Sequence, residues 1–153
     1  MIAIIQRVNN ATIYADEEFS GKNGKGLYIL LGVIKGDEKK DAELISEKIA
    51  KCRIFKDEND KMNLSCQDVG GEVMIVSNFT LGANYKHGNR PDYFASASPN
   101  EANELYEYFI TLMKSKVVNV ATGKFGSDMR TEMSTDGPVT IVFDSEVLKG
   151  NKK

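Results

Sequence analysis

The stretch Ser134-Thr135-Asp136-Gly137-Pro138-Val139-Thr140 lies between two β-rich segments near the end of the chain, residues 127–135 and 138–144. Gly137 permits backbone angles that are closed to other residues, and Pro138 fixes φ and lacks an N–H donor. These two residues therefore cannot pair as part of a regular central strand. Most glycine–proline pairs are only turns, although an X-Pro bond is also where a cis peptide is cheap. On its own, the stretch predicts a turn into the last strand.

A second stretch has a different character and reads Glu72-Val73-Met74-Ile75-Val76-Ser77-Asn78-Phe79-Thr80. Its first part is apolar and β-branched, which is typical of a buried strand. Its last part brings hydroxyl and amide groups to the end of that strand. Because Gly82, Gly88 and Pro91 punctuate the residues that follow, the strand is predicted to open into the long loop 81–97. Long loops in small domains are usually functional or disordered, and the aromatic residues in this one favour order.

Size and composition indicate one ordinary globular domain. The chain has 153 residues, of which 41% are hydrophobic and 27% charged, enough for a single core. No apolar run approaches the length of a membrane span, and the first residues lack the features of a signal peptide. A cytoplasmic protein with no membrane partner is expected. The net charge of −2 gives no sign of DNA binding, although Lys86, His87 and Arg90 form a local basic group.

The residues that usually hold metals or act as nucleophiles are scarce. His87 is the only histidine, and Cys52 and Cys66 are separate from each other in the sequence. A zinc site needs several such ligands, and a Ser-His-Asp triad would depend wholly on one loop histidine. The glycines at 21, 24 and 26 lack the G-K-[ST] and the helix of a phosphate-binding loop. We therefore expect neither a metal nor an organic cofactor.

The remaining pattern predicts a mixed α/β fold. Strands are expected at 1–8, 11–15, 27–34, 72–80, 117–121, 127–135 and 138–144, and residues 62–71 are expected to be irregular. Asp37 is predicted to cap a helix that ends near Cys52, and the capping box at Ser98 opens a second helix that ends near Ser115. Residues 1–148 should form one domain with a barrel-like or two-sheet β core and two main helices outside. The basic tail 149–153 should be frayed.

Several stretches, in order and over nearly the whole chain, resemble the D-aminoacyl-tRNA deacylase family. They are Met1 to Val8, Leu30-Leu31-Gly32-Val33, Arg53-Ile54-Phe55, Lys61 to Ser65, Ser77-Asn78-Phe79-Thr80, Gly88-Asn89-Arg90-Pro91, Thr122 to Gly126 and Asp136 to Thr140. Each piece is weak alone, and the ordered set is specific. Asn78 departs from the family pattern, which has glutamine at this position. A contact that the family makes through that side-chain amide therefore does not carry over directly, whereas contacts of backbone groups in the same segment do.

The resemblance implies a homodimer that hydrolyses the ester between a D-amino acid, or mischarged glycine, and the 3′-terminal ribose of tRNA. It places Ser77, Phe79 and Thr80 in the catalytic pocket. Gly137 and Pro138, joined by a cis bond, would reach the aminoacyl group in the partner's active site and reject L-residues. The resemblance also implies that Asn78 and Met129 lie at the pocket and that Arg7 supports the Gly-Pro loop.

An aminoacyl ester is already reactive, so a modest rate enhancement is enough, and the residues present can supply one. Backbone N–H groups at the end of a strand can stabilise an oxyanion, and the vicinal 2′-hydroxyl of the RNA can activate the attacking water. Thr80 as a covalent nucleophile is the rival mechanism, and no neighbouring base supports it. Two other functions remain open: a related deacylase for mischarged L-aminoacyl-tRNA and a non-catalytic RNA-binding module.

Overall fold

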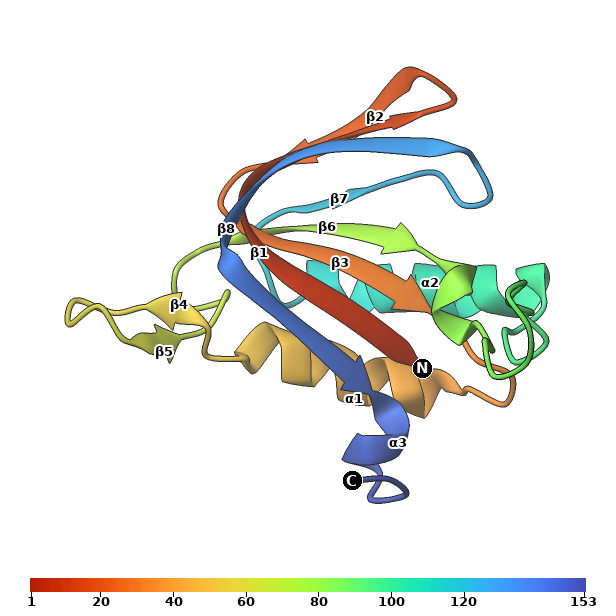
Figure 1. The fold of residues 1–153 in the computed structure, drawn as a ribbon. Helices are drawn as coiled ribbons and strands as arrows, with labels where there is room; N and C mark the ends of the chain where they lie inside the picture. The colour runs from red at the N-terminus through yellow and green to blue at the C-terminus, as the bar shows by residue number, and fades with distance from the viewer.

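A computed structural model describes residues 1–153 and shows one curled sheet with helices packed against its outside (Figure 1). The main sheet has the strand order β2-β1-β3-β6-β7, and β8 pairs with β1 off this path. The strands are β1 (Ile2–Ala15), β2 (Glu18–Asn23), β3 (Gly26–Gly32), β6 (Glu72–Ser77), β7 (Val120–Thr122) and β8 (Met129–Asp144). A bond of 3.0 Å from the Ser20 hydroxyl to the Thr122 carbonyl joins β2 to β7. The sheet is therefore nearly closed into a barrel, which confirms the predicted fold class.

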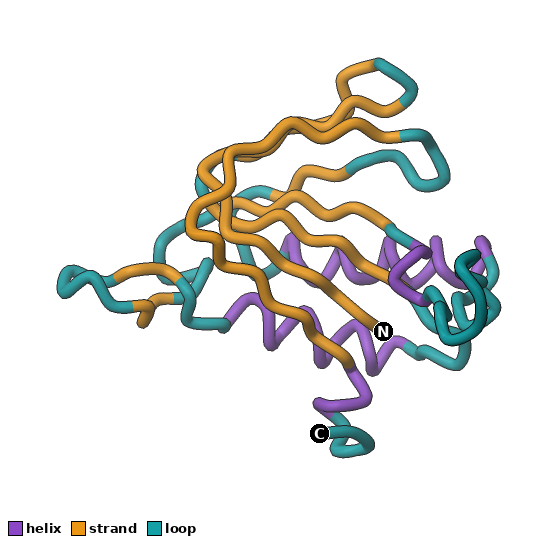
Figure 2. The backbone as a smooth tube through the Cα atoms, viewed as in Figure 1, coloured by secondary structure: helices purple, strands orange, loops and turns teal.

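The centre of the sheet carries the core. Strand β3 is buried along almost its whole length and pairs in parallel with β6, as its continuous apolar run predicts. The outer face of this pair packs on α1 (Lys39–Lys51) and α2 (Pro99–Lys114), and Ile45 and Phe109 are fully buried there. Figure 2 shows both helices on one side of the sheet. A smaller cluster that includes Val8 and Met74 fills the inside of the curl.

Strand β1 is longer than the sequence predicts. Asn9-Asn10 was expected to make a turn between two strands, but β1 runs without interruption from Ile2 to Ala15. The two asparagines lie at a register shift between β1 and β8, and both are exposed. Their polar side chains therefore face solvent without ending the strand. The same local signal serves a bulge as well as a turn.

Strand β8 also runs through the expected break between 127–135 and 138–144. Val8 pairs with Thr135 and Gln6 pairs with Thr140. One residue of β1, Arg7, therefore lies opposite the four residues 136–139 of β8. This bulge removes Gly137 and Pro138 from the ladder, as their backbone chemistry requires, and their peptide bond is cis, as expected.

The helix boundaries differ little from expectation. Ser98 caps α2, which ends at Lys114. Helix α1 begins one residue later than predicted, because Glu38 is its N-cap. The carboxylate of Asp37 instead accepts bonds from the Met1 amine and the Ile34 N–H, both at 2.7 Å. A buried amine is a stronger competitor for a carboxylate than a helix N-terminus.

The remaining elements are short. The whole segment 62–71 was expected to be irregular, but its first residues form β5 (Met62–Leu64), which pairs with β4 (Phe55–Lys56). An unpredicted helix α3 (Ser145–Leu148) follows β8. Lys149, placed in the predicted frayed tail, makes an ion pair of 2.9 Å with Asp41. None of the helices has the length and apolar character that a membrane crossing requires.

Candidate active site

The site is built where β6 ends. After Ser77 the chain turns into η1, a 3₁₀ helix of residues Phe79–Gly82. The side-chain oxygen of Asn78 caps this turn and accepts bonds from the Thr80 N–H at 3.2 Å and the Thr80 hydroxyl at 2.5 Å. The Asn78 amide therefore holds local structure. A glutamine, one methylene longer, cannot close the same short ring.

A cavity of about 670 Å³ opens beside this turn. Its volume is in the range of pockets that bind small ligands, about 300–1,000 Å³. Ser77, Asn78, Phe79 and Met129, which the family resemblance places at a pocket, line this cavity. The rest of the wall comes from β3 and the residue after it, Val76 of β6, the loop residues Tyr93, Ser96 and Ala97, the start of α2 and the segment 125–131.

Two polar groups near the mouth of the cavity have no partner within the chain. The Ser77 hydroxyl makes no hydrogen bond, and the Phe79 N–H, at the start of η1, reaches no acceptor. The first N–H groups of a helix lack intrahelical partners and are ready donors to an anion. In the chain itself, this end of β6 therefore offers a hydroxyl and a main-chain N–H to a bound ligand.

Thr80 lies next to the cavity and does not line it. Its side chain is exposed, and its hydroxyl is taken up by Asn78. No carboxylate, histidine or lysine forms a hydrogen bond with that hydroxyl, so the group has no base to activate it.

None of Gly137, Pro138 and Arg7 lines the cavity of its own chain. Ser77 is level with Leu31, then Ala3, then Phe143 across the sheet. Pro138 is therefore three strand spacings across, about 14 Å, and five residues along β8, about 17 Å, from Ser77. Both Gly137 and Pro138 are exposed, and neither lines the cavity of its own chain.

Arg7 lies under the bulge that carries these two residues. Its side chain is 6% exposed and pairs with the Asp136 carboxylate at 3.1 Å. Its Nε also donates to the Asp136 carbonyl at 3.2 Å, and its Nη1 donates to the Ile54 carbonyl at 2.6 Å. The residue just before Gly137 is thus fixed to β1 by a buried guanidinium.

Sequence reasoning missed one wall of the cavity. Phe125, Gly126, Ser127 and Asp128 line it, and Asp128 is the only charged residue that does. The Asp128 carbonyl accepts a bond of 2.8 Å from the Asp16 N–H, which ties this segment to the β1–β2 turn. Residues 122–126 belong to the motif that carries the family resemblance, and this was the available signal.

The inner surface of the cavity is apolar with one buried phenol. Burial raises the pKa of Tyr28, and a hydrogen bond with the Thr131 hydroxyl at 3.0 Å opposes the shift. Tyr28 therefore stays neutral across physiological pH and supplies shape and a hydrogen-bonding group, with no charge.

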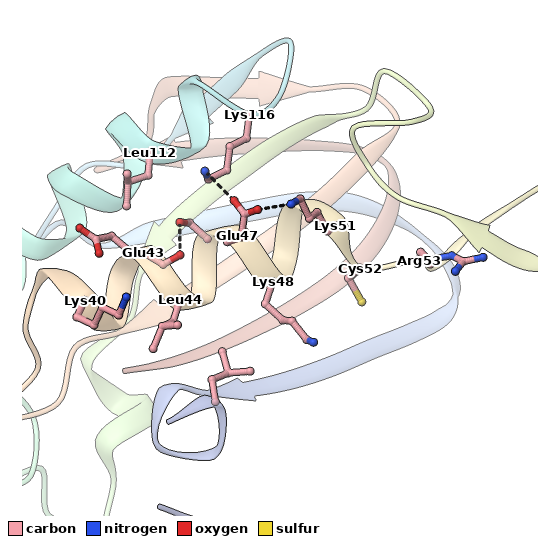
Figure 3. A pocket seen from close by; sticks show the side chains of 12 residues that line it. Lys40, Glu43, Leu44, Glu47, Lys48, Lys51, Cys52, Arg53, Leu112 and Lys116 are labelled. Carbon is pink, nitrogen blue, oxygen red and sulfur yellow. Dashed lines mark hydrogen bonds and ion pairs between the residues drawn. The ribbon is translucent and has the colours of Figure 1, made fainter. Parts of the chain in front are cut away.

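A second hollow of about 760 Å³ lies between α1, α2 and α3 (Figure 3). It contains none of the predicted site residues. Glu47 pairs there with both Lys51 and Lys116, and the remaining cations, Lys40, Lys48 and Arg53, lie at the same surface without a hydroxyl-bearing strand end beside them. Nowhere in the chain do three or more His, Cys, Asp or Glu side chains gather as a metal-binding group. The cavity at the end of β6 is thus the better candidate for a reaction site.

A nearly closed sheet with a cavity of apolar, hydroxyl and amide groups at the end of β6 is the architecture of this small single-domain α/β protein. The model of the D-Tyr-tRNA(Tyr) deacylase family matches residues 4–144. The chain is 48% identical over 141 residues to the D-aminoacyl-tRNA deacylase of Pseudoalteromonas translucida, covering 92% of this chain and 97% of that one. It is 51% identical over 141 residues to the same-named protein of Haemophilus influenzae, with the same coverage.

Two solved structures share the fold of this chain. A structure described as the c-Myc DNA unwinding element binding protein superimposes with a TM-score of 0.89 at 33% identity, covering 94% of this chain and 98% of that one. A probable eukaryotic D-amino acid tRNA deacylase shares the fold, with a TM-score of 0.80 at 14% identity, covering 93% and 97%. The chain belongs to the D-Tyr-tRNA(Tyr) deacylase family, whose members are hydrolases that act on ester bonds.

Proposed function

We propose that this protein hydrolyses the ester between a D-amino acid, or mischarged glycine, and the 3′-terminal adenosine of tRNA. The observation that carries the proposal is the unpartnered Phe79 N–H beside the Ser77 hydroxyl, at the mouth of a cavity of about 670 Å³. Family membership supplies the reaction class, and this arrangement supplies donors for it. Such a cavity suits an aminoacyl-adenosine, and the protein would act in the cytoplasm, where charged tRNA occurs.

The donors at η1 would stabilise the oxyanion that forms when water attacks the ester carbonyl. A fixed main-chain N–H costs no reorganisation during the reaction and is worth about 2.7–4 kcal/mol in the best cases. The vicinal 2′-hydroxyl of the substrate would help to activate the water, since the residues around Thr80 offer no base. The water oxygen bonds to the acyl carbon, the bond from that carbon to the ribose oxygen breaks, and the ribose oxygen leaves with the proton that the water gives up, which releases the free amino acid.

Discrimination between D- and L-residues would come from Gly137 and Pro138 of a second copy. Both are exposed and are held on a bulge by buried Arg7. The outer edge of β8 pairs with no other strand of the chain, and an open edge is a surface for association. Rigid main-chain groups read the α-carbon without reading the side chain. An L-side chain would collide with this wall, whereas glycine would pass.

A deacylation assay on matched tRNAs that carry a D-residue, the L-residue or glycine tests the proposal. We expect the protein to release the D-residue and glycine and to leave the L-ester intact. We also expect sedimentation to show that the protein is a dimer. Preferred release of the L-residue would assign the chain to the related L-specific deacylation. Binding of tRNA without release would reduce it to an RNA-binding module.

A further inference from the structure

We infer that the 84–94 loop is a platform for the unpaired nucleotides that precede the terminal adenosine of the substrate. The inference rests on the proposed function and concerns a surface outside the cavity. The loop follows η1 and lies at the end of the molecule opposite the β4–β5 hairpin (Figure 2). Its residues combine exposed aromatic rings with cationic side chains, which is the surface that single-stranded nucleic acids recognise.

Two aromatic rings on this loop are far more exposed than aromatic side chains of a protein core. Tyr85 is 83% exposed and Phe94 is 78% exposed. Bases stack on such rings in a sequence-tolerant way, because every base has a flat face. Lys86 and Arg90 lie in the same loop and make no ion pair within the chain, so both charges are available to phosphates.

The platform is continuous with the cavity. Phe79, at the cavity mouth, packs edge-on against Tyr93 with ring centroids 5.1 Å apart. Tyr93 also lines a shallower hollow with Arg90, Asp92 and Phe94. One tyrosine thus forms a wall of both. A chain whose last adenosine enters the cavity passes next over this hollow.

The loop is pre-formed despite its exposure. Asn84 and Asp92 exchange two main-chain bonds, of 2.8 and 3.0 Å, that close its base. The Asp92 carboxylate accepts bonds from the Asn84 amide at 3.1 Å and the Phe94 N–H at 3.3 Å, so this acidic group holds the loop together. The Ser96 hydroxyl donates to the Phe79 carbonyl at 2.7 Å and ties the loop to η1. A rigid platform loses little entropy on binding.

The test compares two substrates that share the same D-aminoacyl ester. One is aminoacyl-adenosine, which ends at the cavity, and the other is a trinucleotide that ends in the aminoacylated adenosine. We expect Tyr85→Ala and Phe94→Ala each to raise KM for the trinucleotide about tenfold and to leave KM for aminoacyl-adenosine unchanged. Lys61→Ala and Met62→Ala, at the exposed β4–β5 hairpin, are the matched controls and should change neither.

A second readout isolates the cations. With Lys86→Ala or Arg90→Ala, the slope of log KM for the trinucleotide against log salt should fall by about 0.7 for each lost phosphate contact. Equal losses on both substrates, no loss on either, or dissociation of the dimer in the aromatic variants would overturn the inference. Failure of the wild-type protein to hydrolyse either substrate would instead count against the proposed function.

Discussion

Arg7 and Asp136 are joined twice, by an ion pair of 3.1 Å between side chains and by a bond of 3.2 Å from the Arg7 Nε to the Asp136 carbonyl. Arg7 is the one residue of β1 that faces the bulge 136–139. A planar guanidinium presents its donors in a fixed fork that can hold a carboxylate and two carbonyls at once, whereas a lysine offers a single flexible ammonium. The exposed Gly-Pro pair therefore stands on a buried, well-bonded support.

The first prediction concerns this support. Arg7→Met removes the donors to the Ile54 and Asp136 carbonyls and should lower the free energy of unfolding by about 2 kcal/mol. It should also reduce release of a D-residue from tRNA, because the bulge loses its anchor. Asp136→Asn is the matched control. It keeps both carbonyl bonds and removes only the charge of the Asp136 carboxylate, which is 41% exposed, so it should cost less than Arg7→Met. Urea unfolding of the two variants measures the difference, and equal costs would contradict this account.

The second prediction concerns Gly137. Its φ is +146°, and a Cβ added there would lie 2.3 Å from the Val139 nitrogen, so Gly137→Ala must displace the Gly-Pro pair. Because the site is exposed, the fold should survive while release of D-residues falls by at least tenfold or the bias against L-esters weakens. Gly36→Ala is the control, since Gly36 has φ +88° and open space around it. Unchanged rates and selectivity in the Gly137 variant would remove this residue from the site.

Local patterns predicted most of the fold, and the misses share a physical cause. The helix capped by Ser98 and the doubly buried strand 27–34 are set by neighbouring residues. Asn9-Asn10 looked like a turn because a bulge in a long strand uses the same polar side chains as a turn. Pairing with β8 decides between the two, as the 3.1 Å bond from Asn9 to Ser134 shows. The two residues are 125 positions apart in the sequence, so no local pattern could predict their contact. Asp128 was missed because its approach to the cavity depends on packing between distant segments.

The third prediction concerns acid stability. Burial pushes the pKa of Asp41 upward, but bonds from the Ser145 hydroxyl, the Glu38 N–H and Lys149 outweigh it and hold the pKa at about 2. A lowered carboxyl pKa contributes stability that is present above the unfolded value, near pH 4, and lost as pH falls towards 2. The contribution is about 2 kcal/mol at most.

Asp37 opposes this trend, because burial raises its pKa, against bonds from the Met1 amine and Ile34. The readout is therefore the difference between the wild-type protein and Asp41→Asn in urea midpoint, measured from pH 6 to pH 2. The difference should shrink as the solution is acidified from about pH 4. A difference that stays constant over this range would show that the Asp41 charge does not contribute.

The fourth prediction is that hydrolysis needs no metal ion. The cavity offers hydroxyls, amides and one carboxylate, Asp128, which is too few ligands for a divalent cation held by the protein. D-aminoacyl-adenosine is the appropriate substrate, because its structure does not depend on magnesium as a folded tRNA does. Protein treated with a chelator should keep its rate on this substrate. Loss of the rate, with recovery on addition of one specific ion, would overturn the prediction.

The last prediction separates the two mechanisms at Thr80. The Thr80 hydroxyl donates to the Asn78 side chain at 2.5 Å and lies outside the cavity lining, so it should support the turn and take no part in covalent chemistry. Thr80→Ala keeps the main-chain bond of 3.2 Å to Asn78 and should lower kcat by less than about tenfold, whereas removal of a true nucleophile can cost on the order of 10⁶. Thr80→Ser restores the hydroxyl and should recover most of the rate. A substrate that ends in 2′-deoxyadenosine should react about 10²-fold or more slowly, the usual value of a lost proton-transfer group. An acyl group found on Thr80 by mass spectrometry, or full turnover of the deoxy substrate, would assign the chemistry to the protein side chain.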